Sequence, residues 1–333
     1  MRELSKRRKF SAARTKVLCK RLKPSENIVA GKASVFATGS YGRCEASNHS
    51  DLDLFIVGKK NGVKGPQGKE GSLLSHLDEI RIMADLIEVT RDLNFPEFSD
   101  DGRYVVHYSV HDFTKTLGTP EDDVTNTFTA RLLLLLESCP LMEETVYQEV
   151  VQEVIESYWR DFADHKPNFM PAFLANDILR LWRTFCVNYE ARTKRFPKEK
   201  KTKGKLKNYK LKHSRMLTCY SALLYLLAIY GQKNTVNTED ALEMIKLTPT
   251  ERLEWLAAQS HLKSAHNTIN NLLGQYESFL KTTNSKESEL LDLFLDKNES
   301  HKLMSASFKF GDSIYEALNQ IGNGNSFHRL LVV

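Results

Sequence analysis

Two aspartates separated by a single residue are the side chains of this chain best suited to chemistry. Asp51 and Asp53 lie at the start of the run Leu52–Val57, whose apolar and β-branched residues are typical of a strand. Residues two apart in a strand point to the same face, with Cα atoms about 6.5 Å apart, so both carboxylates can converge on shared cations. Such hard oxygen ligands suit Mg²⁺, with Mn²⁺ as the alternative. Two ions of this kind held together support in-line phosphoryl transfer.

A glycine-serine pair precedes the first aspartate by ten residues. Gly39 and Ser40 follow the short apolar run Ala33–Thr38, at the point where a strand should end and a helix begin. Free backbone N–H groups and the dipole at a helix start attract phosphate, glycine lets the phosphate approach, and the serine hydroxyl adds a donor. The two predicted strands bracket residues 39–51, so they must position the pair beside the aspartates.

These features together resemble the nucleotidyltransferase domain of the polymerase β superfamily. Within it, the segment GSYGRCEASNHSDLDLFIV is most similar to the PII uridylyltransferases and their uncharacterised bacterial relatives. The stretch from Thr129 to Leu141 is similar to the helix that follows the catalytic domain in those proteins. The resemblance covers residues 33–145, under half of the chain, and it implies an α+β nucleotidyltransferase fold.

The resemblance also implies roles for single residues. Gly39 and Ser40 would bind the phosphates of the nucleotide, and Arg43 would contact the triphosphate. Asp51 and Asp53 would be the catalytic ligands of two Mg²⁺ ions. The implied substrate is a nucleoside triphosphate.

A third carboxylate, beside a later strand, is usual in the superfamily. Asp100 and Asp101 are the best placed, because they precede the apolar run Tyr104–Ser109, and Asp100 resembles the aspartate of a similar Asp-x-Gly turn in the uridylyltransferases. An Asp-Gly turn that merely begins a strand explains the same residues equally well. The third catalytic carboxylate therefore stays open between Asp100, Asp101 and neither.

The rest of the chain separates into an α+β part and a helical part. The glycine-spaced basic segment 58–71 is predicted to be a mobile loop without regular structure. A helical pattern begins at Ser72 and stops near Asn94, and after about residue 125 the periodicity is helical almost throughout. The predicted domains are a nucleotidyltransferase domain with a basic N-terminal helix over residues 1–125 and an all-α domain over 126–333 with a Lys-rich insertion at 192–215.

The net charge of +5 is distributed very unevenly. Residues 1–23 contain ten Lys or Arg and one acid, and residues 192–215 contain twelve and one, which leaves −15 for the rest. Concentrated basic segments attract polyanions, so we expect RNA or DNA as a partner, although solvated, inert runs are equally common. Phe196 and Tyr209 could stack bases or simply anchor the segment. The candidate nucleic-acid ligands are Lys198, Lys200, Lys201, Lys203 and Lys205.

Composition excludes several classes of protein. The five cysteines never form a C-x-x-C pair, which argues against a disulfide framework and a zinc site and favours a reducing cytoplasm. The longest mostly apolar stretch, Met216–Tyr230, is shorter than the ~20 residues of a membrane span. The basic N-terminus lacks the apolar core of a secretory signal. A cytoplasmic protein without membrane contact is expected, and the oligomeric state stays open.

Three functions fit these features. The first is Mg²⁺-dependent transfer of a nucleoside monophosphate from a nucleoside triphosphate to an acceptor hydroxyl, with release of pyrophosphate. The +11 segment favours a nucleic-acid 3′ end or an oligonucleotide as the acceptor. The second function is nucleotidylation of a protein hydroxyl, as the uridylyltransferase resemblance implies. The third is a catalytically silent binding module or antitoxin, against which the intact Asp51 and Asp53 argue.

Overall fold

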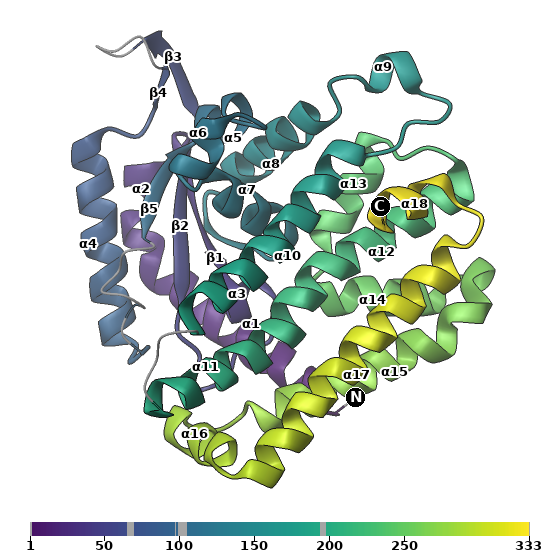
Figure 1. Cartoon of the computed structure of the whole chain (residues 1–333). Helices are drawn as coiled ribbons and strands as arrows, with labels where there is room; N and C mark the ends of the chain where they lie inside the picture. Colours follow the sequence, from purple (N-terminus) through teal and green to yellow (C-terminus); the bar gives the residue numbers. More distant parts are fainter. Residues whose placement is uncertain (1, 65–69, 97, 99–104, 194–197, 333) are drawn as a thin grey trace. The chain divides into compact units, whose positions relative to one another are not determined.

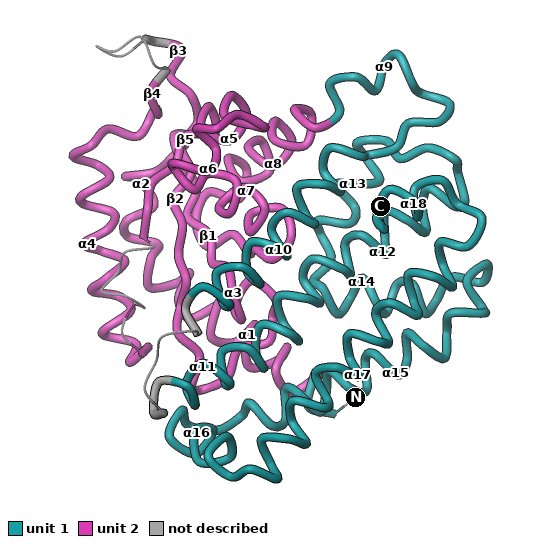
Figure 2. The backbone as a smooth tube through the Cα atoms, viewed as in Figure 1, with its two compact units in different colours: residues 1–4, 159–333 teal, residues 5–158 magenta. Residues whose placement is uncertain are grey.

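The chain folds into two compact units. The computed structural model describes residues 2–64, 70–96, 98, 105–193 and 198–332 (Figure 1). One unit consists of residues 5–158, and the other of residues 1–4 and 159–333 (Figure 2). The candidate carboxylates Asp100 and Asp101 lie outside the described residues, so their prediction stays untested.

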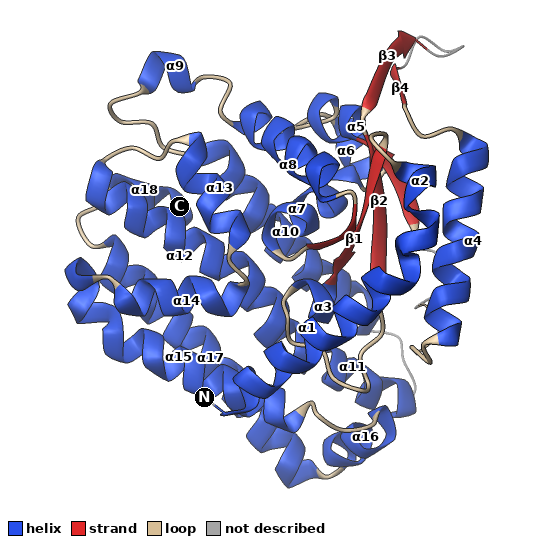
Figure 3. Cartoon of the chain, turned by 180° about the vertical axis from the view of Figure 1, so that it is seen from behind, coloured by secondary structure: helices blue, strands red, loops and turns tan. Residues whose placement is uncertain are grey.

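A four-stranded mixed sheet forms the centre of the 5–158 unit (Figure 3). Its strand order is β5-β2-β1-β6, and β1 pairs antiparallel with both β2 and β6, whereas β2 pairs parallel with β5. The register places Thr38, the last residue of β1, opposite Asp53, the first residue of β2. The strands are β1 (Ala33–Thr38), β2 (Asp53–Gly58), β5 (Val106–Ser109) and β6 (Cys139–Met142).

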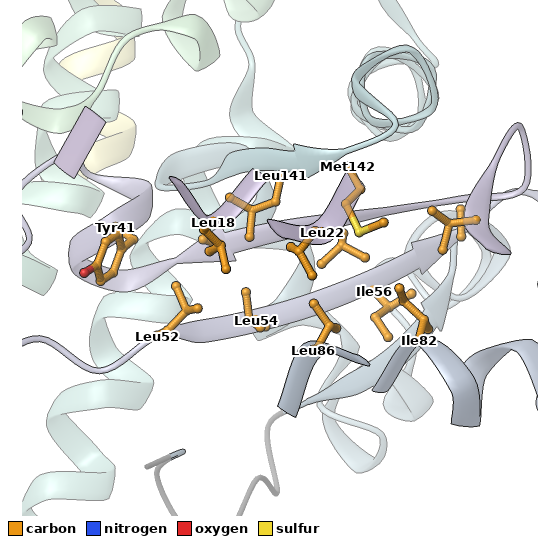
Figure 4. Packing of buried hydrophobic residues seen from close by; sticks show 14 of the residues in the cluster. Leu18, Leu22, Tyr41, Leu52, Leu54, Ile56, Ile82, Leu86, Leu141 and Met142 are labelled. Atoms are coloured by element: carbon orange, nitrogen blue, oxygen red, sulfur yellow. The ribbon is translucent and has the colours of Figure 1, made fainter. Parts of the chain in front are cut away.

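Side chains cover both faces of this sheet, which is why β1 is buried at every position. On one face, alternate residues of β1 and β2 pack in a cluster with Leu18 and Leu22 of α1 and with Ile82 and Leu86 of α4 (Figure 4). On the other face, Phe36 stacks on Phe55 at a centroid distance of 5.6 Å. The two central strands are thereby fixed at the end where the candidate site lies.

Helices and a small hairpin complete the 5–158 unit. The basic N-terminal helix predicted from the sequence is present as α1, whose first residues belong to the other unit. The elements are α1 (Arg2–Leu22), η1 (Lys23–Ser25), α2 (Glu26–Val29), α3 (Gly39–Gly42), β3 (Lys60–Lys64), β4 (Glu70–Ser72), α4 (His76–Asp92), α5 (Val110–Lys115), α6 (Pro120–Val124), α7 (Thr127–Leu136) and α8 (Glu144–Tyr158).

Two details of this unit correct the sequence prediction, and the bounds of the unit differ from the predicted domain boundary. Residues 60–64 and 70–72 have regular structure, because β3 and β4 pair antiparallel with Lys60 opposite Ser72. Helix α4 begins at His76, since the Ser75 side chain accepts a hydrogen bond from the N–H of Asp78 and caps the helix. The compact unit also extends past residue 125 to Tyr158, because β6 adds a strand to the sheet beside β1.

The second unit is helical throughout its described elements, as the sequence predicted for the C-terminal part. The Lys-rich stretch, predicted to be an insertion, is itself mostly helical over its described residues. Among the described residues, none of the helices is long and apolar enough to cross a membrane. The elements are α9 (Phe162–His165), α10 (Ala172–Thr193), α11 (Lys198–Lys210), the π-helical turn η3 (Leu211–Arg215), α12 (Met216–Lys233), α13 (Thr238–Lys246), α14 (Pro249–Ala258), η4 (Ser260–Ala265), α15 (His266–Thr282), α16 (Glu287–Leu295), α17 (Lys297–Gly322) and α18 (Ser326–Val332).

Candidate active site

The sharp turn at the end of β1 brings the backbone of Gly39 against the carboxylate of Asp53. Gly39 has a φ of +64°, which glycine adopts without the steric cost that a side chain brings. A Cβ atom built on Gly39 would lie 2.5 Å from Oδ2 of Asp53. The carboxylate therefore occupies the space that any other residue at position 39 would fill. The two central residues of the predicted site do meet in the fold.

Asp51 lies close enough to Tyr41 for its charge to act on the phenol. Burial raises the pKa of the Tyr41 phenol, a hydrogen bond with Arg14 opposes that rise, and the negative charge of Asp51 adds to it. Both aspartates of the pair are half-buried, so their carboxylates retain access to solvent. This is the environment in which two carboxylates can take up a cation.

A buried ion-pair network supports the turn from behind. The Arg43 guanidinium donates from Nε to Glu45 Oε2 and from Nη1 to Glu137 Oε2, each at 2.9 Å. The two carboxylate side chains are at most 1% exposed. Glu137 also accepts a hydrogen bond from the Gly39 N–H at 3.3 Å. The end of α7 is in this way tied directly to the start of α3.

Close backbone packing holds the same two elements together. A Cβ atom on Gly42 would lie 2.0 Å from the carbonyl oxygen of Glu137, so only glycine fits where α3 meets the end of α7. Helix α1 fixes the loop that follows: Arg7 donates to the Glu45 carbonyl at 3.0 Å, and Ser11 accepts from the Ala46 N–H at 2.8 Å. Both ends of the turn are therefore anchored to neighbouring helices.

Two of the predicted phosphate ligands have partners within the chain. The Gly39 N–H, expected to be open to phosphate, faces the Glu137 carboxylate, and α3 is a single helical turn that supplies little dipole. Arg43 is engaged with two buried carboxylates, a geometry that favours positioning of the turn over contact with a triphosphate. Ser40 is half-buried, and its hydroxyl makes no hydrogen bond with the described part of the chain.

The predicted lysine ligands belong to a different part of the fold. Lys201, Lys203 and Lys205 are exposed on α11, within the unit of residues 1–4 and 159–333. The side chains of Lys198 and Lys200 lie outside the described residues. Tyr209 is buried and packs against Phe279 at a centroid distance of 5.4 Å, so it anchors the helix instead of stacking a base.

Comparison with protein families yields one match. Residues 16–100 match the nucleotidyltransferase domain family. This range covers about a quarter of the chain, includes the turn and both aspartates, and supports a polymerase β-like superfamily domain at the N-terminal side. Searches among curated proteins and among solved structures gave no match.

The donor set of the nucleotidyltransferase domain fits a divalent cation. Asp51 and Asp53 offer hard carboxylate oxygens, and Asp53 is held in place by the glycine backbone beside it. Across the described ranges, no three or more His, Cys, Asp or Glu side chains gather in a way that could hold a metal ion. Asp51 and Asp53 remain the candidate ligands for the expected pair of Mg²⁺ or Mn²⁺ ions.

Sequence reasoning missed Glu45 and Glu137, which complete the site from behind. One signal was available for Glu137: it follows the apolar helix α7, where a negative charge opposes the helix dipole and needs a partner. The partner, Arg43, is 94 residues away in sequence, so spacing alone could not identify it.

Proposed function

We propose that the chain transfers a nucleoside monophosphate from a nucleoside triphosphate to an acceptor hydroxyl. The acceptor oxygen attacks the α-phosphorus and loses its proton, while the bond from that phosphorus to the leaving pyrophosphate breaks. The observation that carries the proposal is the contact between Asp53 and the backbone of Gly39, inside a range that matches nucleotidyltransferase domains. A silent binding module would not need a carboxylate pair beside this turn.

The residues of the turn would divide the work. The Ser40 hydroxyl would donate to the phosphates, and the absence of a side chain at Gly39 would leave room for the Asp53 carboxylate beside them. Asp51 and Asp53 would hold the divalent cations, which when bound neutralise the charge of the phosphates and of the leaving pyrophosphate. Arg43, Glu45 and Glu137 would keep the turn in place without touching the substrate.

For the acceptor, we favour a nucleic-acid 3′ end over a protein hydroxyl. The two basic segments of the sequence support a polyanionic acceptor. The resemblance to PII uridylyltransferases supports a protein acceptor, but it gained no support from the comparisons, since no curated relative matched. Both acceptors need the same chemistry at the Asp51–Asp53 pair.

The test measures pyrophosphate release and label transfer from each α-labelled nucleoside triphosphate, with Mg²⁺ or Mn²⁺ and with total RNA or cell lysate as acceptor. We expect one acceptor class to become labelled. Asp51→Asn and Asp53→Asn should each lower the rate by at least about 100-fold, because each removes charge at the reacting phosphates. Asp164→Asn, which changes an exposed acid of the other unit, is the control. Transfer that survives in both site variants would contradict the proposal.

A further inference from the structure

Four lysines form one exposed stripe along α1. Lys6, Lys9, Lys16 and Lys20 are all exposed, and at 100° per residue they fall within about 80° of each other around the helix axis. At about 1.5 Å per residue, the stripe is about 21 Å long. The opposite side of α1 carries Leu18 and its buried neighbours, which pack into the core under the sheet. The lysines therefore occupy the side of the helix farthest from its packing face.

Acidic side chains of the described residues do not neutralise this stripe. Glu3 is the only acid in α1, and it lies one turn before the first lysine. The nearby cations that do form ion pairs lie outside the stripe: Arg21 pairs with Asp92, and Lys23 pairs with Glu26. None of the four stripe lysines forms an ion pair with the part of the chain that the structure describes.

The second basic helix, α11, differs in this respect. It packs against α16, whose acids include Glu287, Glu289 and Asp292. Lys203 forms an ion pair with Glu287 at 3.7 Å, and Lys205 donates to the Ser300 hydroxyl at 3.4 Å. Part of the charge of α11 is thus matched inside its own unit, whereas the charge of the α1 stripe faces solvent alone.

We propose that the lysine stripe of α1 binds the phosphodiester backbone of the acceptor nucleic acid. The proposal rests on the proposed function, because it identifies the bound strand with the acceptor. The four lysines are exposed, and no exposed aromatic side chain lies among them, so they can contact phosphates but cannot stack on bases. We therefore expect binding that does not depend on the nucleotide sequence. A membrane surface fits less well, because the apolar side of α1 is buried in the core and cannot enter a bilayer.

The position of α1 connects this stripe with the candidate site. The same helix, through Arg7 and Ser11, holds residues 45 and 46 of the loop that leads to Asp51. A strand lying on the outer side of α1 is separated from that loop by about one helix diameter, 10–12 Å. A few nucleotides at its 3′ end are enough to cover this distance.

The experiment measures binding without nucleotide, so that it does not depend on transfer. Fluorescence anisotropy follows a labelled 20-nucleotide RNA and the DNA of the same sequence between 50 and 200 mM salt. The variant K6Q/K9Q/K16Q/K20Q should bind at least about tenfold more weakly at 50 mM salt. The plot of the logarithm of the association constant against the logarithm of the salt concentration has a negative slope. The variant should reduce the magnitude of this slope by about 3, because each phosphate contact with a single strand contributes about 0.7.

Two further variants of equal charge change make the result specific. K201Q/K203Q/K205Q/K207Q removes charge from α11, and K263Q/K281Q/K297Q/K309Q removes four scattered exposed lysines. Both should keep most of the wild-type slope, and thermal unfolding should show that all three variants are folded. Three results would overturn the inference. The α1 variant could keep the wild-type slope, or only the α11 variant could lose binding. The protein could also bind anionic vesicles but neither oligonucleotide.

The same variants separate this inference from the proposed function. If the α1 variant loses binding and the wild-type protein transfers no nucleotide to the strand, the stripe stands and the proposed activity fails. If transfer to the strand occurs at an unchanged rate in the α1 variant, the stripe fails and the proposed activity stands.

Discussion

The candidate site depends at the residue scale on the absence of one side chain. Gly39 combines a positive φ with an Asp53 carboxylate oxygen only 2.5 Å from the position that a Cβ atom would take, two constraints that act separately. The φ alone penalises any other residue by about 1–2 kcal/mol. A side chain at position 39 would also displace the Asp53 carboxylate, the proposed metal ligand, so a substitution should affect activity more than stability.

Gly39→Ala should therefore lower the rate of nucleotide transfer by about 100-fold while lowering the free energy of unfolding by only a few kcal/mol. Gly31→Ala is a matched control, because Gly31 has a φ of +66° but no atom lies within 4 Å of its Cβ position. Transfer kinetics and urea unfolding of both variants provide the measurement. Equal losses of activity in the two variants would show that backbone strain, and not the Asp53 contact, is what matters.

Residue spacing predicted that Gly39 and Asp53 lie together, and it could not predict the contacts that hold the turn. Gly39 and Asp53 are near in sequence and lie at the ends of two strands that pair antiparallel, so the local pattern was sufficient to bring them together. The buried pair between Arg43 and Glu137 depends on where α7 ends, 94 residues later. A pattern of residue types carries no information on such a long-range contact, so the sequence offered no partner for Arg43 within the fold.

At the element scale, the π-helical turn η3 places a titratable ring inside an aromatic cluster. His213 stacks on Phe279 with an interplanar angle of 4° and a centroid distance of 4.6 Å, and it also stacks on Phe310. Its Nδ1 lies 2.9 Å from the Tyr209 carbonyl oxygen, so the neutral ring donates this hydrogen bond. Burial lowers the pKa of His213 to about 4, since the charged form would lose its solvent.

This pKa predicts acid destabilisation of the unit of residues 1–4 and 159–333. Between the unfolded pKa of about 6.5 and the folded value of about 4, the unfolded chain binds more protons, so the free energy of unfolding decreases as the pH falls. From pH 7 to pH 4.5 the loss from His213 should be about 2.5 kcal/mol. Urea unfolding of the wild-type protein and of His213→Phe at both pH values gives the loss of unfolding free energy with acid for each. The variant should lose less than the wild type.

A matched variant of an exposed histidine controls for the general effect of acid on carboxylates. His301→Gln changes an exposed ring on α17 and should retain the full pH dependence of the wild type. If His213→Phe loses stability with acid as steeply as the wild type does, the buried ring is not the group that responds.

The sequence predicted helices and strands whose apolar residues recur at regular spacing. It did not predict strands that form because a partner strand pairs with them. The strands at 33–38 and 52–57 and the helices of the C-terminal part follow local periodicity. The β3–β4 hairpin has little apolar pattern. It is held by backbone pairing, which composition does not reveal. Likewise β6 is four residues long, and its pairing with β1, together with the packing of α8 on β1, extends the first unit to Tyr158.

At the scale of the whole molecule, the two compact units carry different properties. The cluster that contains Leu54 and Ile56 lies wholly within residues 5–158, together with the turn and the aspartate pair. The aromatic cluster around His213 lies wholly within the other unit. A ligand of the candidate site and a change at His213 should therefore act on different cores.

Calorimetry can test this division directly. A nucleoside triphosphate analogue with Mg²⁺, at about 100 times its dissociation constant, should stabilise the unit that binds it by about 2.7 kcal/mol. For a unit of residues 5–158 this corresponds to an increase in melting temperature of about 5–10 °C. We expect two unfolding transitions, of which the analogue shifts one and His213→Phe shifts the other. A single transition that responds to both changes would show instead that the two cores unfold as one cooperative body. If the analogue shifts only the transition that His213→Phe also shifts, nucleotide binding lies outside residues 5–158.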